Sequence, residues 1–208
     1  MRSLLISTLI AFMILSGRNA NADQYDIGAD VAVKVDYFHF TDSLLHRLNA
    51  QNSIYVGVEG YKEMFFPYFY LGAEVGWAGP SGRFTGLFPP GQIIPGGYYT
   101  LDTSTNYVPL ELNAKYVIRI LSNLDFGVGG GFSVNYFDAK FAEPFGSSGD
   151  SDWLWGGQIF GELNYKYQSL FIGINVKYEL TEDIYLFGVD SGLSADNLRI
   201  GGQIGLTF

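Results

Sequence analysis

Apolar and polar residues alternate along most of the chain with a period of two. In the stretch 26–38, for example, Val31 and Val33 occupy one phase, while Asp30 and Lys34 occupy the other. A period of two is typical of β-strands that have two different faces. The pattern occurs eight times, at 26–38, 53–61, 68–78, 105–117, 124–136, 153–167, 170–180 and 197–208. The sequence therefore predicts eight strands.

The predicted strands are long, and their apolar phase carries no Asp, Glu, Lys or Arg. Most have about 9–13 residues, more than the ~5–6 of an average globular strand and close to the ~9–11 of a tilted strand that crosses a bilayer. The links between them alternate in length. Short links are 62–67, 118–123 and 168–169, and long links are 39–52, 79–104, 137–152 and 181–196. This rhythm is typical of an up-and-down barrel with short turns at one end and long loops at the other.

The alternation alone does not say which face points inward. A soluble, lipocalin-like barrel would place its apolar residues around an internal ligand. Here the polar phase has few charges and many Gly, Tyr and Asn residues, which suits a narrow interior. Aromatic residues gather at strand ends, as in the girdles of membrane barrels; they are Tyr37, Tyr68, Trp77, Tyr116, Tyr136, Trp153, Trp155, Tyr167 and Tyr178. We therefore predict an all-β fold: an eight-stranded antiparallel up-and-down transmembrane β-barrel with short periplasmic turns and long extracellular loops.

The composition excludes several classes of function. The net charge of −9 argues against a nucleic-acid partner, because phosphate binding needs a basic face. The chain has no cysteine, which removes disulfides, thiolate metal sites and cysteine nucleophiles. No His, Asp or Glu cluster has the spacing of a metal site, and no glycine-rich phosphate loop is present. We expect no cofactor and no metal.

The N-terminal residues have the pattern of a signal peptide. Arg2 precedes an apolar run from Leu4 to Leu15, and Ala20 and Ala22 form a small-x-small cleavage signal. The alternative is an N-terminal membrane anchor, but the apolar run is too short to cross the ~30 Å hydrocarbon core as a helix. We predict a cleaved signal peptide at 1–22 and a barrel domain at 23–208.

The strand rhythm and the ending at 198–208 resemble those of small eight-stranded outer-membrane barrels of Gram-negative bacteria, the OmpA, OmpX and opacity-protein group. The resemblance implies a place in the cell outer membrane with both termini in the periplasm. It also implies contact with lipid and lipopolysaccharide, and insertion by the outer-membrane assembly machinery. In such proteins a terminal aromatic residue with alternating apolar residues acts as an assembly signal, here Phe208, Leu206 and Ile204.

Charged residues on the polar phase are the first candidates for a functional role. They are Asp30, Lys34, Asp36, Glu59, Glu74, Glu111, Lys115, Asp125, Glu162, Lys166, Lys177, Glu179 and Arg199. One interpretation is a network of ion pairs that fills the barrel, because buried charges must be paired. The other is a narrow channel for ions or small solutes. Eight strands leave an interior barely wide enough for side chains, which favours the filled interior.

The long loops are candidates for a recognition surface. The link 79–104 is rich in apolar residues for a loop in water, so it either covers the barrel mouth or binds a partner. Its candidate residues are Phe84, Phe88, Ile93, Ile94, Tyr98 and Tyr99. The four long links together carry ten acids against Arg47, Arg83 and Lys140. These acids have three interpretations: they form a solvated acidic surface, they bind divalent cations that bridge to lipopolysaccharide, or they attract a cationic partner.

Catalytic residues are scarce. The only histidines, His39 and His46, lie in the first long link, near Asp42 and Ser43. A lipid A-modifying enzyme would need a nucleophile, a base and an orienting residue in a defined geometry, and no matching motif is present. We predict a non-enzymatic barrel with a structural or surface-interaction role, with the channel as the alternative and the enzyme third.

Overall fold

The computed structural model of the chain describes residues 28–42, 50–88, 97–143, 146–186 and 189–208. The predicted signal peptide lies outside these residues. The strands are β1 (Ala29–Phe40), β2 (Asn52–Glu63), β3 (Phe69–Ala78), β4 (Ser81–Phe88), β5 (Gly97–Leu121), β6 (Leu124–Glu143), β7 (Gly146–Tyr167), β8 (Leu170–Thr181), β9 (Asp183–Leu186), β10 (Val189–Ser194) and β11 (Asn197–Thr207). In the part of the chain that is described, no helix is long and apolar enough to span a membrane.

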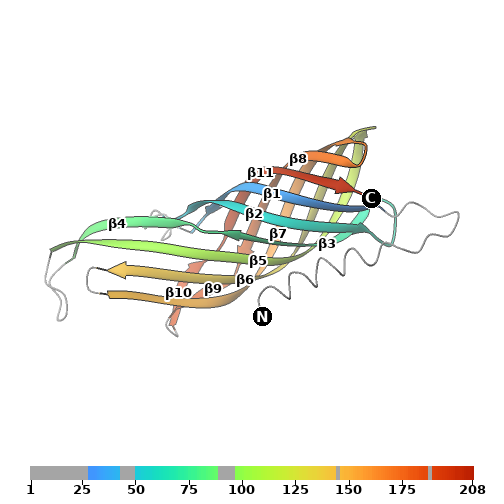
Figure 1. Cartoon of the computed structure of the whole chain (residues 1–208). Coiled ribbons are helices and arrows are strands. Elements are labelled where there is room, and N and C mark those ends of the chain that lie inside the picture. The colour runs from blue at the N-terminus through green and yellow to red at the C-terminus, as the bar shows by residue number, and fades with distance from the viewer. Residues whose placement is uncertain (1–27, 43–49, 89–96, 144–145, 187–188) are drawn as a thin grey trace, which may run out of the picture.

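Eight of these strands close into a ring. The sheet runs in the order β3-β2-β1-β11-β8-β7-β6-β5, and an additional pairing of β3 with β5 completes the circle. Neighbours in the ring are antiparallel, including the first and last strands, where Val31 lies opposite Leu206. Figure 1 shows the barrel with its strands strongly tilted. The prediction of an eight-stranded antiparallel barrel is confirmed.

Side chains alternate between the outer surface and the interior. On β1, Val33 is 46% exposed, whereas the adjacent Lys34 is 1% exposed. Residues of the same phase lie opposite one another, so Val33 is aligned with Val58 on β2 and Ile204 on β11. The outer surface is thus apolar and the interior polar, the reverse of a soluble barrel built around an apolar ligand. A continuous apolar surface of this extent is far larger than the patches that soluble monomers expose.

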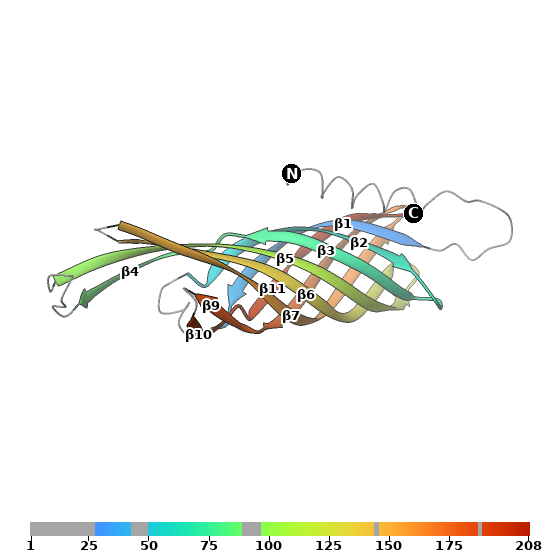
Figure 2. The same cartoon turned by 90° about the horizontal axis from the view of Figure 1, so that it is seen from below.

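Several strands continue beyond the closed ring. β3 pairs with β5 only as far as Ala78 opposite Tyr107, yet β5 begins ten positions earlier in the chain, at Gly97. There β5 pairs with β4 on one side and with β6 on the other, and β6 pairs with β7. We call this four-stranded continuation the extended sheet: β4 with residues 97–106 of β5, 137–143 of β6 and 146–153 of β7. Figure 2 shows it reaching well past the barrel.

The prediction of long loops at 79–104 and 137–152 is therefore wrong for most of these residues. The hairpins keep their cross-strand pairing past the ring, from Ser81 opposite Ser104 to Phe88 opposite Gly97, and as far as Glu143 opposite Gly146. Threonine, phenylalanine and tyrosine, which favour strands, recur along 79–104, and phenylalanine recurs along 137–152. Ile93 and Ile94 of the first link lie outside the described residues.

The link 181–196 also forms strand. β9 and β10 make a hairpin of their own, and hydrogen bonds from backbone N–H groups tie its base to the barrel. Tyr185 donates its N–H to the carboxylate of Asp152 on β7 at 2.8 Å, and Thr181 donates its N–H to that of Asp196 at 2.7 Å. Ile184 and Ala195 are thereby buried against the barrel mouth. The base of this hairpin therefore packs against side chains at the barrel mouth.

Candidate functional site

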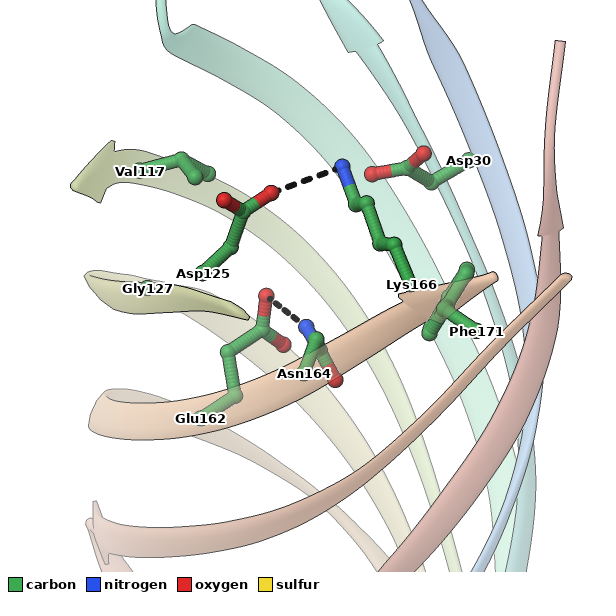
Figure 3. Close-up of a pocket in the computed structure, with 8 residues that line it drawn as sticks. All are labelled: Asp30, Val117, Asp125, Gly127, Glu162, Asn164, Lys166 and Phe171. Carbon is green, nitrogen blue, oxygen red and sulfur yellow. Dashed lines mark hydrogen bonds and ion pairs between the residues drawn. The ribbon is translucent and has the colours of Figure 1, made fainter. Parts of the chain in front are cut away.

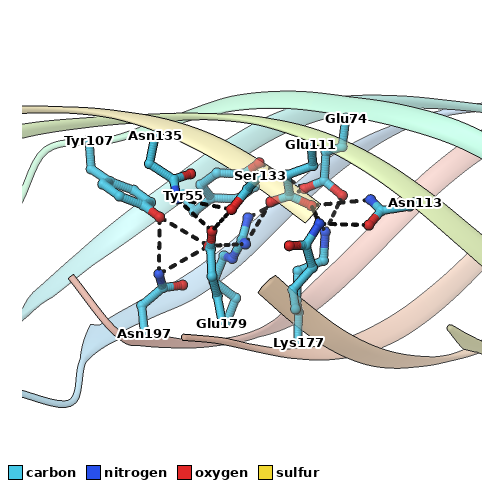
Figure 4. A network of polar contacts seen from close by, with 12 residues as sticks. Tyr55, Glu74, Tyr107, Glu111, Asn113, Ser133, Asn135, Lys177, Glu179 and Asn197 are labelled. Carbon is cyan, nitrogen blue, oxygen red and sulfur yellow. Dashed lines mark hydrogen bonds and ion pairs between the residues drawn. The ribbon is translucent and has the colours of Figure 1, made fainter. Parts of the chain in front are cut away.

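The barrel interior holds a connected set of ion pairs, and Figure 4 shows the part of it around Glu74, Glu111, Lys177 and Glu179. We call it the interior ion network; its members are Lys34, Glu59, Glu74, Glu111, Lys177, Glu179 and Arg199. These side chains come from six strands, with one each on β1, β2, β3, β5 and β11 and two on β8. The ring brings these strands around one axis, and all seven residues are buried.

Arg199 is the centre of the network. Its Nη2 lies 2.6 Å from Glu111 Oε1 and 2.9 Å from Glu179 Oε2, and its Nη1 lies 3.6 Å from Glu74 Oε1. The guanidinium also lies over the ring of Tyr55, 4.8 Å from its centroid. One cation thus faces three carboxylates and an aromatic ring, so its loss would leave several buried charges without their main partner.

Two lysines extend the network. Lys177 Nζ lies 2.6 Å from Glu74 Oε2 and also contacts Glu111. Lys34 Nζ lies 3.2 Å from Glu59 Oε2 and 3.3 Å from Glu74 Oε2. Glu74 therefore receives charge-assisted hydrogen bonds from both lysines, which are the stronger kind in a protein interior.

Neutral donors surround the carboxylate of Glu179. Tyr107 donates its hydroxyl to Glu179 at 3.0 Å, and Asn135 and Asn197 donate amide hydrogens at 2.8 and 3.2 Å. Ser133 also donates to it. A buried carboxylate with this many donors has its hydrogen-bonding capacity met, as a stable buried charge requires.

A second set of polar contacts lies further toward the short turns. Lys115 Nζ is 2.7 Å from Glu162 Oε1 and 3.9 Å from the centroid of the Tyr61 ring. Gln203 donates to Glu162 at 3.2 Å and to Asn164 at 2.7 Å. These contacts link β2, β5, β7 and β11.

The third set lies at the end of the interior near the C-terminus and is drawn in Figure 3. Lys166 Nζ lies 2.9 Å from Asp125 Oδ2, and Asp30 accepts a hydrogen bond from Thr207 at 2.8 Å. A cavity of about 10 Å³ lies among these side chains, which is room for about one water molecule.

Aromatic side chains close the opposite end. We call this group the mouth cluster: Phe38, Phe40, Tyr55, Ala78, Tyr107, Phe137, Ala139, Leu154, Ile184 and Ala195. Phe40 packs edge-on against Phe38 with ring centroids 4.7 Å apart, and against Tyr107 at 5.6 Å. Together with the ion pairs below it, the cluster fills the described interior with side chains.

Glycine makes room for one of these aromatic rings. A Cβ atom at Gly76 would overlap the Tyr55 ring, so only glycine lets the ring lie across β3 at this point. From that position the Tyr55 hydroxyl donates to Glu74 at 2.7 Å. Gly76 thus allows Tyr55 to reach Glu74, a member of the interior ion network.

The extended sheet carries a polar outer face. Arg83 on β4 donates to Asp102 on β5 through Nε at 2.6 Å and through Nη2 at 3.4 Å. This hydrogen bond and the negative charge of Asp102 raise the pKa of the Arg83 guanidinium. On β6, Lys140 lies 3.6 Å from Asp138, which also accepts a hydrogen bond from Asn106.

An open groove of about 700 Å³ runs along this face. Most of its lining residues have a hydroxyl or a charged group on a short or long carbon chain; the residues are Ser81, Gly82, Arg83, Asp102, Thr103, Ser104, Lys140, Ala142 and Ser147. They come from all four strands of the extended sheet. The arrangement offers hydrogen-bond donors and acceptors side by side on a hydrogen-bonded backbone.

The architecture matches that of several solved outer-membrane proteins. The attachment invasion locus protein Ail of Yersinia pestis aligns with a TM-score of 0.54 and 11% identity, over 88% of this chain and 100% of that one. Neisserial surface protein A aligns with a TM-score of 0.54 and 10% identity, over 88% and 96% of the two chains. A major outer membrane protein of Thermus thermophilus gives 0.56 and 11%, over 88% and 100%.

The chain has the fold of the small outer-membrane β-barrels. No protein-family model matches the sequence, and no curated protein matches it. The likeness therefore lies in the strand arrangement.

Within this outer-membrane barrel fold, all thirteen charged residues expected on the polar phase point into the interior, and all but Lys166 are buried. Eleven of them make ion pairs with one another. The other two, Asp36 and Asp30, accept hydrogen bonds from Asn175 and Thr207. The sequence could not pair them, because the partners lie on different strands.

The candidate recognition residues of the link 79–104 are only partly described. Phe84 and Phe88 lie on β4, and Tyr98 and Tyr99 lie on β5, across the hairpin. Ser81, Arg83, Asp102 and Lys140 of the groove were not predicted as a site. Their alternate positions along the hairpin could have indicated strands with a shared face, but the segment 79–104 was predicted to be a loop.

Several acids of the predicted loops bind the barrel's own backbone. Asp196 accepts the N–H of Thr181, Glu182 accepts the N–H of Trp155 at 2.9 Å, and Asp152 accepts the N–H of Tyr185. These carboxylates shape the mouth of the barrel. They are therefore a weaker basis for cation bridges than the sequence indicated.

The histidines and the C-terminal residues are the remaining candidates. His39 Nδ1 lies 2.7 Å from Asn52 Oδ1, which also accepts the hydroxyl of Tyr37 at 2.6 Å, and His46 lies outside the described residues. Phe208 is exposed beside β1, and its backbone N–H donates to the Ala29 carbonyl at 2.8 Å. It stands on the same outward phase as Leu206 and Ile204.

Proposed function

We propose that the chain is an outer-membrane barrel that carries a firm, polar sheet beyond the membrane surface for contact with surface molecules. In this proposal residues 1–22 are removed as a signal peptide, and residues 23–208 form the barrel domain. Both termini lie in the periplasm at the short-turn end. The extended sheet, at the other end, stands outside the cell.

One observation carries the proposal: the outer face of the long strands changes character at a ring of aromatic residues. On β5 the outward residues are largely apolar from Val108 to Ile120 and polar from Asn106 to Asp102. On β6 and β7 the same change occurs just beyond Tyr136 and Trp153, whose ring centroids lie 5.2 Å apart. Aromatic girdles of this kind mark the edge of the hydrocarbon layer.

The apolar band has the dimension of a membrane. At ~3.3 Å per residue and a tilt of about 40°, the stretch from Val108 to Ile120 spans roughly 30 Å. This equals the thickness of the hydrocarbon core of a typical bilayer. The extended sheet then begins where the headgroups begin, which supports its contact with the sugars of lipopolysaccharide.

The chemistry of the groove favours hydroxyl-rich ligands. Arg83 is already paired with Asp102, and Lys140 lies beside Asp138, so little positive charge is left over for a polyanion. Ail has been solved with the heparin analogue sucrose octasulfate. That ligand is a polyanion, which a face with paired cations would not favour. We therefore propose neutral sugar groups as the partner of the groove.

Surface labelling tests the proposed placement of the sheet. The chain has no cysteine, so Ser104→Cys on the extended sheet and Ser169→Cys at a short turn each provide a single thiol. A membrane-impermeant maleimide should label Ser104→Cys on intact cells, and should label Ser169→Cys only after the outer membrane is permeabilised. Labelling of the short turn alone on intact cells would reverse the proposed orientation.

The alternative of a narrow channel receives less support. The ion pairs and the mouth cluster fill the described interior, and a filled interior leaves no water path for ions. Refolded protein in a planar bilayer should give no steady conductance steps at moderate voltage. Reproducible steps that disappear when the central cation is changed, as in Arg199→Leu, would favour the channel.

We further propose that Phe208, Leu206 and Ile204 serve as a signal for the outer-membrane assembly machinery. Support comes from their outward phase and from the pairing of β11 with β1, which closes the barrel. An enzymatic role has weaker support, since His39 is bonded to Asn52 and no nucleophile, base and orienting residue meet among the described residues.

A further inference from the structure

The connection between β2 and β3 is an exposed aromatic turn. It consists of Met64, Phe65, Phe66, Pro67 and Tyr68, and we call it the aromatic turn. Phe65 is 80% exposed and Phe66 is 54% exposed. The neighbouring turns at the same end are polar, with Ser122 and Asn123 between β5 and β6, and Gln168 and Ser169 between β7 and β8. The aromatic content is therefore particular to this connection among the three short turns.

The backbone of the turn would suit glycine better than aromatic residues. Phe65 has a φ of 68° and Tyr68 has a φ of 69°, a region where bulky side chains are outliers. Glycine adopts these angles without strain. Aromatic residues at such positions point to a use for the side chains themselves.

The turn is nevertheless well held. Met64 donates its N–H to the Phe69 carbonyl at 2.8 Å, and Tyr68 donates its N–H to Glu63 at 2.5 Å. The ring of Phe66 packs on that of Phe69 with centroids 4.7 Å apart. The exposed rings thus project from a fixed scaffold.

The aromatic turn continues the apolar outer surface of the barrel. Val117 of β5 donates its N–H to the Tyr68 carbonyl at 2.9 Å, so the turn lies beside the last residues of β5. There Ile118 and Ile120 are exposed on the outward face. On β5 the apolar band therefore extends to the level of the aromatic turn.

Cationic groups flank this surface. The guanidinium of Arg119 lies over the Tyr68 ring, 5.6 Å from its centroid. Its Nε lies 3.8 Å from Asp125 Oδ1, and its side chain is 58% exposed. Lys62 lies on the outward phase of β2 just before the turn. Aromatic rings beside lysine and arginine are the combination that favours the headgroup region of a bilayer, where phosphates meet the cations.

We propose that the aromatic turn inserts into the headgroup region of the periplasmic leaflet and anchors that edge of the barrel. The occupant of this surface is a phospholipid leaflet, because the surface is continuous with the lipid-facing band and has the cations Lys62 and Arg119 beside it. The inference rests on the proposed placement of the barrel in the outer membrane. It assigns a membrane contact to a turn that would otherwise stand in the periplasm.

Spin labels on single cysteines test the anchor in the refolded full chain. Labels at Phe65→Cys, Ser122→Cys and Leu112→Cys are compared in vesicles of phosphatidylethanolamine and phosphatidylglycerol. Oxygen concentrates in the hydrocarbon, whereas a nickel chelate stays in water. We expect chelate contact at position 65 to be roughly threefold lower than at position 122, because interfacial aromatic residues lie at the headgroup level and not in bulk water. Chelate contact at position 112 should be lower still.

The reference sites separate the possible failures. If the label at 112 contacts the chelate freely, the placement of the barrel in a membrane fails, and the anchor fails with it. If position 112 is protected but position 65 equals position 122, the turn projects into water, and the anchor alone is overturned.

A second variant tests whether the turn holds the barrel at its depth. In the double variant Phe65→Ser with Phe66→Ser, a label at Ile120→Cys should gain chelate contact, because that edge rises toward water. The matched control, Gln168→Ser at a polar turn, should leave the label unchanged. A gel-shift assay for folded barrel checks both variants, and an unchanged label at 120 in a folded double variant would overturn the anchoring role.

Discussion

Replacing Arg199 with leucine is expected to lower the free energy of unfolding by about 3–5 kcal/mol, the cost of breaking a buried ion pair by removing one partner. The guanidinium lies within 2.9 Å of both Glu111 and Glu179 and faces Glu74 as well. Leucine leaves these carboxylates buried with fewer counter-charges. Reversible unfolding in urea, in small lipid vesicles, measures the change.

The control for Arg199 is an ion pair outside the barrel. Lys140 lies 3.6 Å from Asp138 on the extended sheet, with its side chain 63% exposed. Exposed pairs contribute about 0–1 kcal/mol, so Lys140→Leu should change stability little. Equal effects for the two variants would contradict a stabilising role for the interior ion network. Adding Glu179→Gln to Arg199→Leu should restore part of the loss, because one unpaired charge is removed.

Replacing Leu112 with arginine is expected to destabilise the barrel by about 2–4 kcal/mol, as a charge on the lipid face near the bilayer midplane does. Leu112 is 70% exposed on the outward face of β5, near the middle of the apolar band. In a soluble barrel the same exposed position would tolerate arginine with a change within ~0.5 kcal/mol. The unfolding free energy in vesicles therefore distinguishes lipid from water around this residue.

A matched control for Leu112 lies on the same face of the same strand. Ser104 is exposed on the outward phase of β5, beyond the aromatic girdle. Ser104→Arg should change stability by about 0–1 kcal/mol, the value for charges near or beyond the interface. A large loss at 104 together with no loss at 112 would place the membrane around the extended sheet instead.

Much of the barrel could be predicted from the sequence, because each strand has an apolar outer face and a polar inner face, and the two residue types alternate accordingly. The alternation of Val33 with Lys34, repeated over eight segments, fixes strand existence and phase. The pairing of charges could not be predicted in this way. Arg199 meets Glu111 and Glu74 only because the strand register and tilt bring β11, β5 and β3 to one level in the interior.

The extended sheet escaped prediction for a different reason. Glycine and proline are frequent in 79–104, and such composition usually marks loops. Pro89, Pro90 and Pro95 fall outside the described strands β4 and β5, so the described ladder between these strands loses no hydrogen bond to them. The alternation of Thr103 and Thr105 with Ser104 was the remaining signal, weaker because both faces are polar there.

The most direct test is a spin-label scan along β5 of the refolded protein in lipid vesicles. Labels at even positions from 108 to 120 should contact oxygen and avoid the nickel chelate, because they face lipid. Labels at 102 and 104 should contact the chelate, and labels at odd positions from 107 to 117 should contact neither, because the interior is filled. Free chelate contact at the even positions from 108 to 120 would contradict the account and indicate a barrel in water.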